Sequence, residues 1–324
     1  MKSICKICTS RRFGSHQIRH LHYEPVAVKD MSTATNFKGS TDTNATSTTS
    51  TATAADTRIG GFRDKVFSQM LKPYFQKSPV LIKGYYDPSH EMPSSRWKDL
   101  QYLKDRVGSE TICTVEIGGS YSNFANGSMD RPEISFGDFI SYLEMFEQKY
   151  GQFGTYDDTK SQKEDICIQD LVYLAQNDMT SFTSLMQEFH VPELVKNDCY
   201  KVGEGKLYNM MLWFGPRGCQ TPLHYDPLDN LLIQFVGRKN VYLLPKSSDR
   251  LDMNWHYCGQ EGQQYNTSPV DVIEPDLDKY PLFRDAPPIL VAELHEGDIL
   301  YIPSQWWHQV ISIDRSISIN AWWR

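Results

Sequence analysis

The side chains best suited to chemistry lie in the segment 221–227, which reads Thr-Pro-Leu-His-Tyr-Asp-Pro. Side chains of an extended strand alternate between its two faces, so His224 and Asp226 are expected to project to the same side. An imidazole beside a carboxylate supplies two ligands of a 2-His-1-carboxylate metal site. That arrangement leaves coordination positions open for a co-substrate and O2, which suits Fe(II). Alone the pair is a weak signal, because either residue can equally cap a turn or hydrogen-bond in a core.

A third ligand has to come from another strand, and His308 is the natural candidate. It follows the segment 302–307, Ile-Pro-Ser-Gln-Trp-Trp, in which a proline-containing turn leads into a new strand. This context strengthens the prediction of a metal site formed by His224, Asp226 and His308. Four other histidines have no such partner in the sequence and are interpreted as structural or surface residues: His90, His190, His256 and His295.

Iron alone does not define a reaction, and an oxygenase that uses 2-oxoglutarate also needs a fixed cation for the distal carboxylate. Arg238 and Lys239 follow the strand after the His-x-Asp segment and are candidates for this role. The alternative is a solvated hairpin turn, in which both residues only keep the tip soluble. Spacing alone does not choose between Arg238 and Lys239, or between the two interpretations.

These candidate residues lie in a part of the chain that is dominated by short β-rich runs from about Lys206 onward. Turns with Gly, Pro or Asp separate the runs, which predicts a sandwich or barrel of two packed sheets. Upstream, strands are expected at 79–82 and 111–117, and a short helix at 181–191. Ser135 followed by Asp138 resembles a capping box that opens another helix. The seven later strands are expected at 207–214, 231–236, 240–244, 289–294, 299–302, 309–313 and 316–323.

The overall composition is that of an ordinary globular chain: 324 residues, 40% hydrophobic, 23% charged and a formal net charge of −7. No run approaches the roughly 18 apolar residues of a membrane-spanning helix. The seven cysteines form no disulfide framework, and their odd number indicates reduced thiols and an intracellular protein. These features exclude a collagen, a coiled coil, a disulfide knot and an integral membrane protein.

Charge is distributed unevenly along the chain. Residues 1–58 carry eight Lys/Arg and four Asp/Glu, a balance of +4, which leaves −11 for the rest. Residues 1–30 are interpreted as a basic arm, either a mitochondrial transit peptide or a disordered tail, and 31–58 as a Ser/Thr-rich disordered linker. Residues 59–324 are expected to form one catalytic domain. The cellular location stays open between the mitochondrion and the nucleus or cytoplasm, and so does the oligomeric state.

Taken together, several motifs resemble a jumonji-C domain. They are His224–Tyr225–Asp226–Pro227, Asn230, Gly237–Arg238–Lys239, the segment 297–303 and Trp307–His308. Within that family the chain is most similar to the small hydroxylase branch, and above all to the lysine demethylase 8 class of protein arginyl hydroxylases. The resemblance runs from about Pro79 to Arg324.

The resemblance implies a mainly β fold with flanking helices, the double-stranded β-helix of the cupin and jumonji-C jelly roll. It also implies Fe(II) bound by His224, Asp226 and His308, with Lys239 rather than Arg238 as the partner of the distal carboxylate of 2-oxoglutarate. Six further residues fall where the family contacts the co-substrate or lines its pocket: Tyr121, Thr221, Asn230, Trp213, Asn320 and Trp322.

The activity implied by the resemblance is hydroxylation of a protein side chain, with 2-oxoglutarate and O2 converted to succinate and CO2. The acidic balance of residues 59–324 favours a basic protein or peptide substrate, and an arginine above others. Demethylation of methyl-lysine is the main alternative, because hydroxylation of an N-methyl group also removes it. A tRNA-base hydroxylase is disfavoured because RNA needs a basic surface. A catalytically silent binding module is disfavoured because all three ligands and Lys239 are present.

Overall fold

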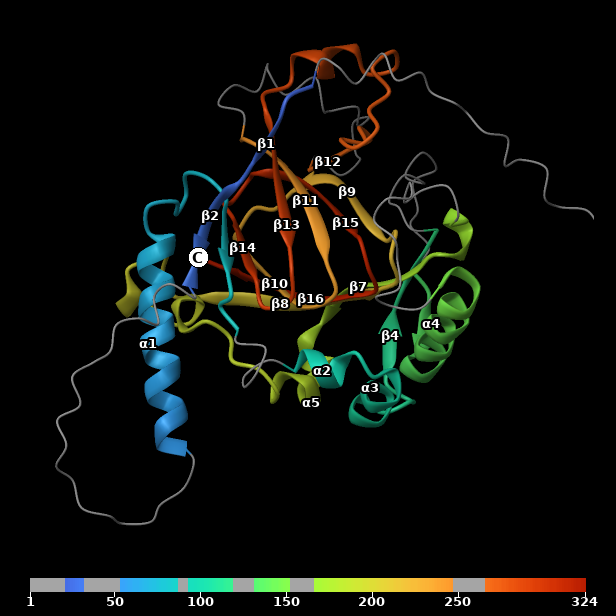
Figure 1. The fold of residues 1–324 in the computed structure, drawn as a ribbon, viewed down its shortest axis with the longest axis horizontal. Coiled ribbons are helices and arrows are strands. Elements are labelled where there is room, and N and C mark those ends of the chain that lie inside the picture. Colours follow the sequence, from blue (N-terminus) through green and yellow to red (C-terminus); the bar gives the residue numbers. More distant parts are fainter. Residues whose placement is uncertain (1–20, 32–52, 87–92, 119–130, 152–165, 247–265) are drawn as a thin grey trace, which may run out of the picture.

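The computed structural model describes residues 21–31, 53–86, 93–118, 131–151, 166–246 and 266–324. Two facing β-sheets form its centre (Figure 1). The six-stranded sheet contains, in spatial order, β1 (Tyr23–Pro25), β13 (Ile289–Leu294), β11 (Lys239–Leu244), β15 (Trp307–Ser312), β9 (Gln220–Tyr225) and β12 (Thr267–Ser268). The eight-stranded sheet contains β2 (Ala27–Asp30), β3 (Val80–Lys83), β14 (Ile299–Ile302), β10 (Asp229–Val236), β16 (Ser316–Trp323), β8 (Leu207–Gly215), β7 (Val172–Asp178) and β5 (Glu116–Ile117).

The strands β8 to β11 and β13 to β16 divide equally between the two sheets. Strands 8, 10, 14 and 16 lie in one sheet and strands 9, 11, 13 and 15 in the other, so the chain passes repeatedly from sheet to sheet. This is the double-stranded β-helix expected from the sequence, and the predicted fold class is confirmed. One consequence is that β9 and β15, which are far apart in sequence, are hydrogen-bonded neighbours.

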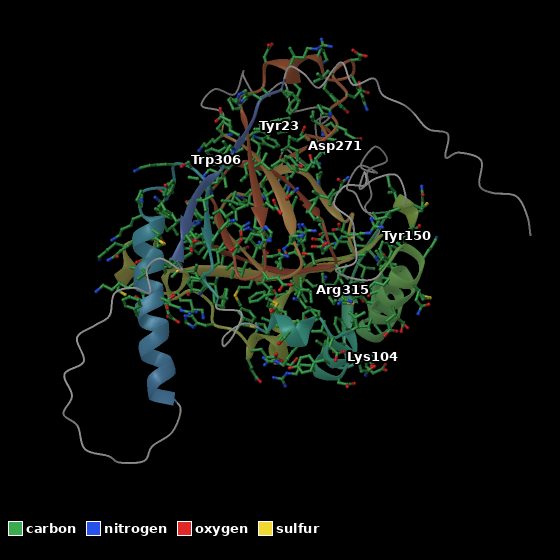
Figure 2. All side chains as sticks on the ribbon, in the orientation of Figure 1. Tyr23, Lys104, Tyr150, Asp271, Trp306 and Arg315 are labelled. Carbon is green, nitrogen blue, oxygen red and sulfur yellow. The ribbon has the colours of Figure 1, made fainter. Side chains whose placement is uncertain are left out.

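Side chains fill the space between the two sheets and the space between the sheet and the helices (Figure 2). Leu232 of β10 faces the space between the sheets, where it packs with residues such as Val241 and Leu300. Leu231 and Ile233 point the other way, into the core shared with the helices. Burying one such aliphatic side chain contributes roughly 1.5–3 kcal/mol. Because β10 is buried on both faces, it packs against the six-stranded sheet on one side and against the helices on the other.

The helices cover the outer face of the eight-stranded sheet and one of its edges (Figure 1). No helix in the described part of the chain is both long and apolar enough to cross a membrane. The described α-helices are α1 (Thr53–Leu71), α2 (Ser94–Trp97), α3 (Leu100–Val107), α4 (Phe136–Tyr150) and α5 (Thr183–Met186). Short 3-10 turns lie at Ile168–Asp170 (η4), Met179–Phe182 (η5), Glu193–Val195 (η6), Asp198–Tyr200 (η7) and Pro281–Asp285 (η9).

The start of α4 confirms the predicted capping box. The Ser135 hydroxyl accepts a hydrogen bond from the Asp138 backbone N–H at 3.0 Å and donates to the Asp138 carboxylate at 2.8 Å. These bonds satisfy one of the amide groups that every helix leaves free in its first turn. Downstream, Phe139, Leu143 and Phe146 are buried on one face of the helix.

Two elements differ from the sequence prediction. The expected strand at 111–117 divides into β4 (Ile112–Thr114), which pairs with β6 (Glu133–Ser135), and β5, which pairs with β7. The side-chain amide of Asn177 bonds to both the N–H and the carbonyl of Thr114, and so replaces a strand partner at the break. The expected helix at 181–191 is only the η5 turn followed by the single turn of α5.

The expected N-terminal boundary is also different. The sequence predicts that residues 21–31, here called the N-terminal strap, belong mostly to the basic arm, yet β1 pairs in parallel with β13 and β2 with β3. The strap therefore crosses from the edge of one sheet to the edge of the other, and Val26 and Met31 are buried. Helix α1 begins at Thr53, before the predicted boundary at residue 59. Residues 1–20 and 32–52, which hold the rest of the predicted arm and linker, lie outside the described residues.

Candidate metal centre

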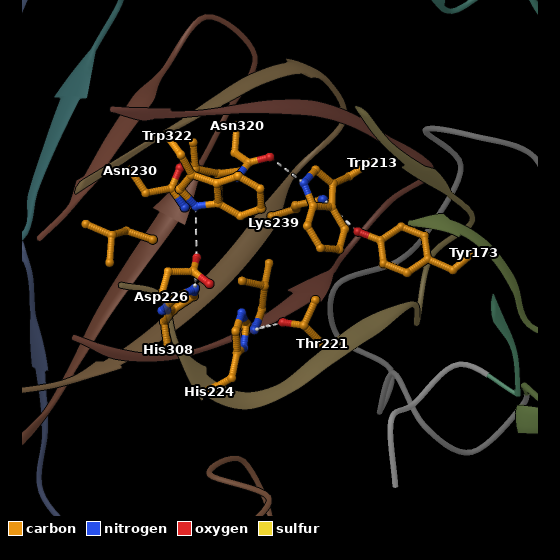
Figure 3. Close-up of a pocket in the computed structure, with 13 residues that line it drawn as sticks. Tyr173, Trp213, Thr221, His224, Asp226, Asn230, Lys239, His308, Asn320 and Trp322 are labelled. Atoms are coloured by element: carbon orange, nitrogen blue, oxygen red, sulfur yellow. Dashed lines mark hydrogen bonds and ion pairs between the residues drawn. The ribbon is translucent and has the colours of Figure 1, made fainter. Parts of the chain in front are cut away.

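The two predicted histidine ligands are direct partners across one β ladder. His224 on β9 is paired with His308 on β15, and their ring centroids are 4.2 Å apart. Asp226 follows the end of β9, and its Oδ2 lies 3.7 Å from Nε2 of His308. One potential ligand atom from each of the three residues lies within 4.8 Å of the others. The sequence-predicted triad is therefore brought together by strand register (Figure 3).

Backbone carbonyls fix the orientation and tautomer of both imidazoles. Nδ1 of His224 lies 2.8 Å from the Pro222 carbonyl, and Nδ1 of His308 lies 3.0 Å from the Trp306 carbonyl. A carbonyl only accepts, so each Nδ1 must carry a hydrogen, and the lone pair of the neutral form of each ring then lies on Nε2. Burial lowers the pKa of His308, and the adjacent His224 lowers it further, which keeps this ring neutral. Neutral imidazoles held in this way are suited to binding a metal.

The third member of the triad is oriented by the last strand. The indole Nε1 of Trp322 on β16 donates a 3.0 Å hydrogen bond to Oδ2 of Asp226. Two imidazoles and one oriented carboxylate form the donor set that non-heme Fe(II) prefers. The residues present therefore fit such an ion.

Lys239 provides a buried cation in the same pocket. Only 1% of the residue is exposed, and its Nζ donates to the Tyr173 hydroxyl at 3.1 Å and to the Ser318 hydroxyl at 2.6 Å. Burial lowers the pKa of Lys239 to about 7. Within the described ranges no carboxylate lies at ion-pair distance from it. An ammonium buried without an acidic partner is costly unless an anion binds there.

Arg238, the other candidate cation, is occupied elsewhere. Its guanidinium forms a two-point ion pair with Asp314, with Nε 2.8 Å from Oδ2 and a longer bond from a terminal nitrogen. Lys239, the first residue of β11, lines the pocket, whereas the Arg238 side chain is held by Asp314 and is not part of the pocket lining. The structure thus distinguishes two residues that spacing alone could not.

The other predicted residues line the same pocket, with one exception. The Thr221 hydroxyl accepts the Val310 backbone N–H at 3.2 Å, where the β9–β15 register shifts. Trp213 donates its indole N–H to the Asn320 side chain at 2.9 Å. Tyr121 lies outside the described residues. Among the described residues the lining is Tyr173, Trp213, Thr221, His224, Asp226, Asn230, Leu232, Lys239, Ile302, His308, Val310, Asn320 and Trp322.

Asn230 and Tyr173 add polar groups to this lining. The side-chain oxygen of Asn230 is buried and makes no hydrogen bond within the described structure, so it can serve a ligand. Tyr173, on β7, was absent from the predicted site residues although its hydroxyl contacts Lys239. A contact between residues 66 positions apart leaves no local pattern from which spacing could identify it.

Comparison with known proteins agrees with this geometry. The model of the cupin-like domain family matches residues 68–324. The chain belongs to this family. Its relatives place it in the jumonji-C branch: it is 36% identical over 234 residues to JmjC domain-containing protein D of Dictyostelium discoideum. That match covers 69% of this chain and 46% of the relative.

Two further relatives of this jumonji-C chain are named as demethylases. Lysine-specific demethylase JMJ30 of Arabidopsis thaliana is 29% identical over 257 residues, covering 77% of this chain and 51% of the relative. Lysine-specific demethylase 8 of Danio rerio is 31% identical over 253 residues, covering 76% and 53%. The chain thus spans about half the length of these relatives. The prediction of a jumonji-C, cupin-like domain is confirmed.

Proposed function

We propose that this chain is an Fe(II)- and 2-oxoglutarate-dependent oxygenase that hydroxylates an arginine side chain of a protein substrate. One oxygen atom of O2 enters a C–H bond of the substrate and the other enters succinate, while 2-oxoglutarate loses CO2. When bound, Fe(II) supplies the activation of O2 that this oxidation needs. The observation that carries the proposal is a buried ammonium, on Lys239, in the same pocket as the His224, Asp226 and His308 cluster.

Lys239 is the proposed partner of the distal carboxylate of 2-oxoglutarate. The desolvated ammonium gains a counter-charge when the co-substrate binds, so the two buried charges compensate each other. The Tyr173 and Ser318 hydroxyls hold the ammonium in place through their hydrogen bonds. The 2-oxo acid end of 2-oxoglutarate would then lie at the metal site formed by His224, Asp226 and His308.

The remaining walls of the pocket restrict water and orient the metal ligands. Leu232, Ile302 and Val310 contribute apolar surface, and a dry pocket strengthens the ion pair at Lys239. Trp322 keeps the Asp226 carboxylate in one orientation through its indole N–H. Ligands that are held before the metal arrives bind it more tightly than free side chains do.

The proposed substrate is basic because the domain is acidic. Residues 59–324 carry a formal charge of −11. A field of this sign attracts a cationic peptide and repels nucleic acid. This charge is the argument for an arginine substrate and against a tRNA base.

Demethylation of methyl-lysine is the second candidate, and the names of two relatives favour it. Hydroxylation of an N-methyl carbon gives an unstable product that releases the methyl group as formaldehyde. The same pocket serves both reactions, so the outcome depends on which carbon the substrate presents to it.

A peptide assay separates these functions. The full chain, Fe(II) and 2-oxoglutarate are incubated with matched peptides that contain arginine, lysine or methyl-lysine, and with tRNA. The proposal predicts one added oxygen on the arginine peptide, with an equal amount of succinate. Loss of a methyl group without any oxygen gain on arginine would establish the demethylase instead. Succinate release that persists in His224→Ala would show that the site is wrongly assigned.

A further inference from the structure

The turn between β14 and β15, residues 303–306, contacts two ligands of the candidate metal centre, Asp226 and His308. The backbone N–H of Gln305 donates to the carbonyl of Asp226 at 2.7 Å. One residue later, the Trp306 carbonyl holds Nδ1 of His308 at 3.0 Å. The Ser304 hydroxyl adds a 3.0 Å bond to the Pro227 carbonyl, next to Asp226. A single short turn therefore connects one carboxylate ligand to one histidine ligand.

The backbone of this turn is in a conformation that its sequence does not favour. Gln305 has φ +67°, in the left-handed region that glycine adopts most readily. The Trp306 N–H donates a 3.1 Å hydrogen bond to the Pro303 carbonyl, which closes a β-turn of residues 303–306. Gln305 is the third residue of this turn. A positive φ at that place is the mark of a type II turn, which usually carries Gly or Asn there.

The type of turn decides where the Gln305 N–H points. Types I and II differ mainly by a half rotation of the central peptide, the one that joins Ser304 to Gln305. In the observed turn this N–H reaches the Asp226 carbonyl. In a type I turn it would face the opposite way, and the carbonyl of a metal ligand would lose its donor. The unfavourable φ is therefore tied to the bond that holds Asp226.

We propose that Gln305 is a positioning residue whose left-handed backbone holds Asp226 and His308 at metal-binding separation. Strained backbone of this kind persists where the surrounding structure requires it, and it is frequent at functional sites. The inference rests on the proposed metal site, and it assigns the role to the backbone of Gln305 rather than to its side chain.

The test measures Mn(II) affinity by electron paramagnetic resonance titration of the full chain, with Mn(II) as a redox-stable substitute for Fe(II). Gln305→Val disfavours a positive φ because Val is β-branched, and it should weaken Mn(II) binding about 10- to 100-fold and change the line shape of the bound ion. Gln305→Gly keeps the turn and should bind as the wild type does. Lys201→Val is the matched control, because Lys201 is exposed, has φ +57° and its neighbour Val202 packs in the helix-side core.

Three outcomes would overturn the inference: equal Mn(II) affinity in Gln305→Val and the wild type, weaker binding in Gln305→Gly, or an equal loss in Lys201→Val. The glycine variant keeps the proposal falsifiable if the valine variant does not fold. A wild-type chain that binds no Mn(II) would instead contradict the proposed function itself, so the two failures are distinguishable.

Discussion

Trp322 and Asp226 are joined by a 3.0 Å hydrogen bond from the indole Nε1 to the carboxylate Oδ2, so the final strand of the fold orients the candidate metal ligand. The sequence predicts Trp322 as part of the pocket wall, and the structure shows that it also orients a ligand of the candidate metal centre. Partners of this kind fix the direction of a ligand and tune its basicity.

Trp322→Phe should keep the aromatic wall and remove this hydrogen bond. We expect Mn(II) or Fe(II) affinity to fall about 10- to 100-fold with little change in unfolding temperature. Calorimetric titration of the metal measures the effect. Trp97→Phe is the control, since Trp97 also donates its indole N–H to a carboxylate, Glu188, at 3.2 Å but contacts no member of the triad. An equal loss of affinity in both variants would contradict the assigned role of Trp322.

Lys239→Met should weaken 2-oxoglutarate binding about 100-fold or more, because it leaves a buried carboxylate without its partner. The ligand-free variant should also be more stable than the wild type, since it no longer buries an ammonium. Arg238→Met is the matched control. It breaks the Asp314 ion pair and should reduce stability without changing co-substrate affinity. Isothermal titration with 2-oxoglutarate checks the binding, and unchanged affinity in Lys239→Met would exclude Lys239 as the anion partner.

Co-substrate affinity should also decrease as the pH rises above 7. Burial lowers the pKa of Lys239 to about 7 in the ligand-free fold, and only the protonated form pairs with a carboxylate. The unfolded chain keeps this proton up to about pH 10.4. Between these values the unfolded state binds more protons, so the ligand-free fold gains stability from this residue as the pH rises.

Two titrations check this dependence. The dissociation constant of 2-oxoglutarate, measured from pH 6 to 9, should rise by up to about tenfold per pH unit above 7 in the wild type. Urea unfolding over the same range should show a gain in stability that Lys239→Met lacks. A dissociation constant that stays flat across this range would contradict a titrating Lys239.

Removal of the N-terminal strap should destabilise the domain, whereas removal of the residues before it should not. A chain that begins at residue 21 keeps Val26 and Met31 in the core, and a chain that begins at residue 32 loses both. Burial of these two side chains alone is worth about 3 kcal/mol or more. Chemical denaturation of the two truncated chains measures the difference, and equal stability would show that the strap contributes nothing.

The later strands and the metal triad were predictable because their signals are local. Short β-rich runs bounded by turns place the seven predicted strands close to their observed bounds, whereas β9 and β12 were not among them. The His-x-Asp spacing predicted that His224 and Asp226 lie on one side of an extended segment, although β9 ends at Tyr225, and the proline turn before His308 indicated the partner strand. The Ser135 cap was likewise encoded within four residues.

Three features that sequence reasoning missed depend on distant contacts. The strap mixes charged and apolar residues next to a basic segment, and its pairing with β13 and β3 joins residues far apart in the chain. Tyr173 acquires its role only from its contact with Lys239. The break after Thr114 depends on the amide of Asn177, which is 63 positions away. Local propensity contains no information about such contacts.

The transfer of an oxygen atom from O2 to a substrate side chain tests the account most directly. The wild-type chain is incubated with an arginine peptide, Fe(II), 2-oxoglutarate and isotopically heavy O2, and the products are analysed by mass spectrometry, with Asp226→Ala in parallel. We expect one heavy oxygen atom on the arginine residue and one in succinate, both abolished in the variant. A peptide without heavy oxygen, or a label that persists in Asp226→Ala, would contradict an oxygenase centred on His224, Asp226 and His308.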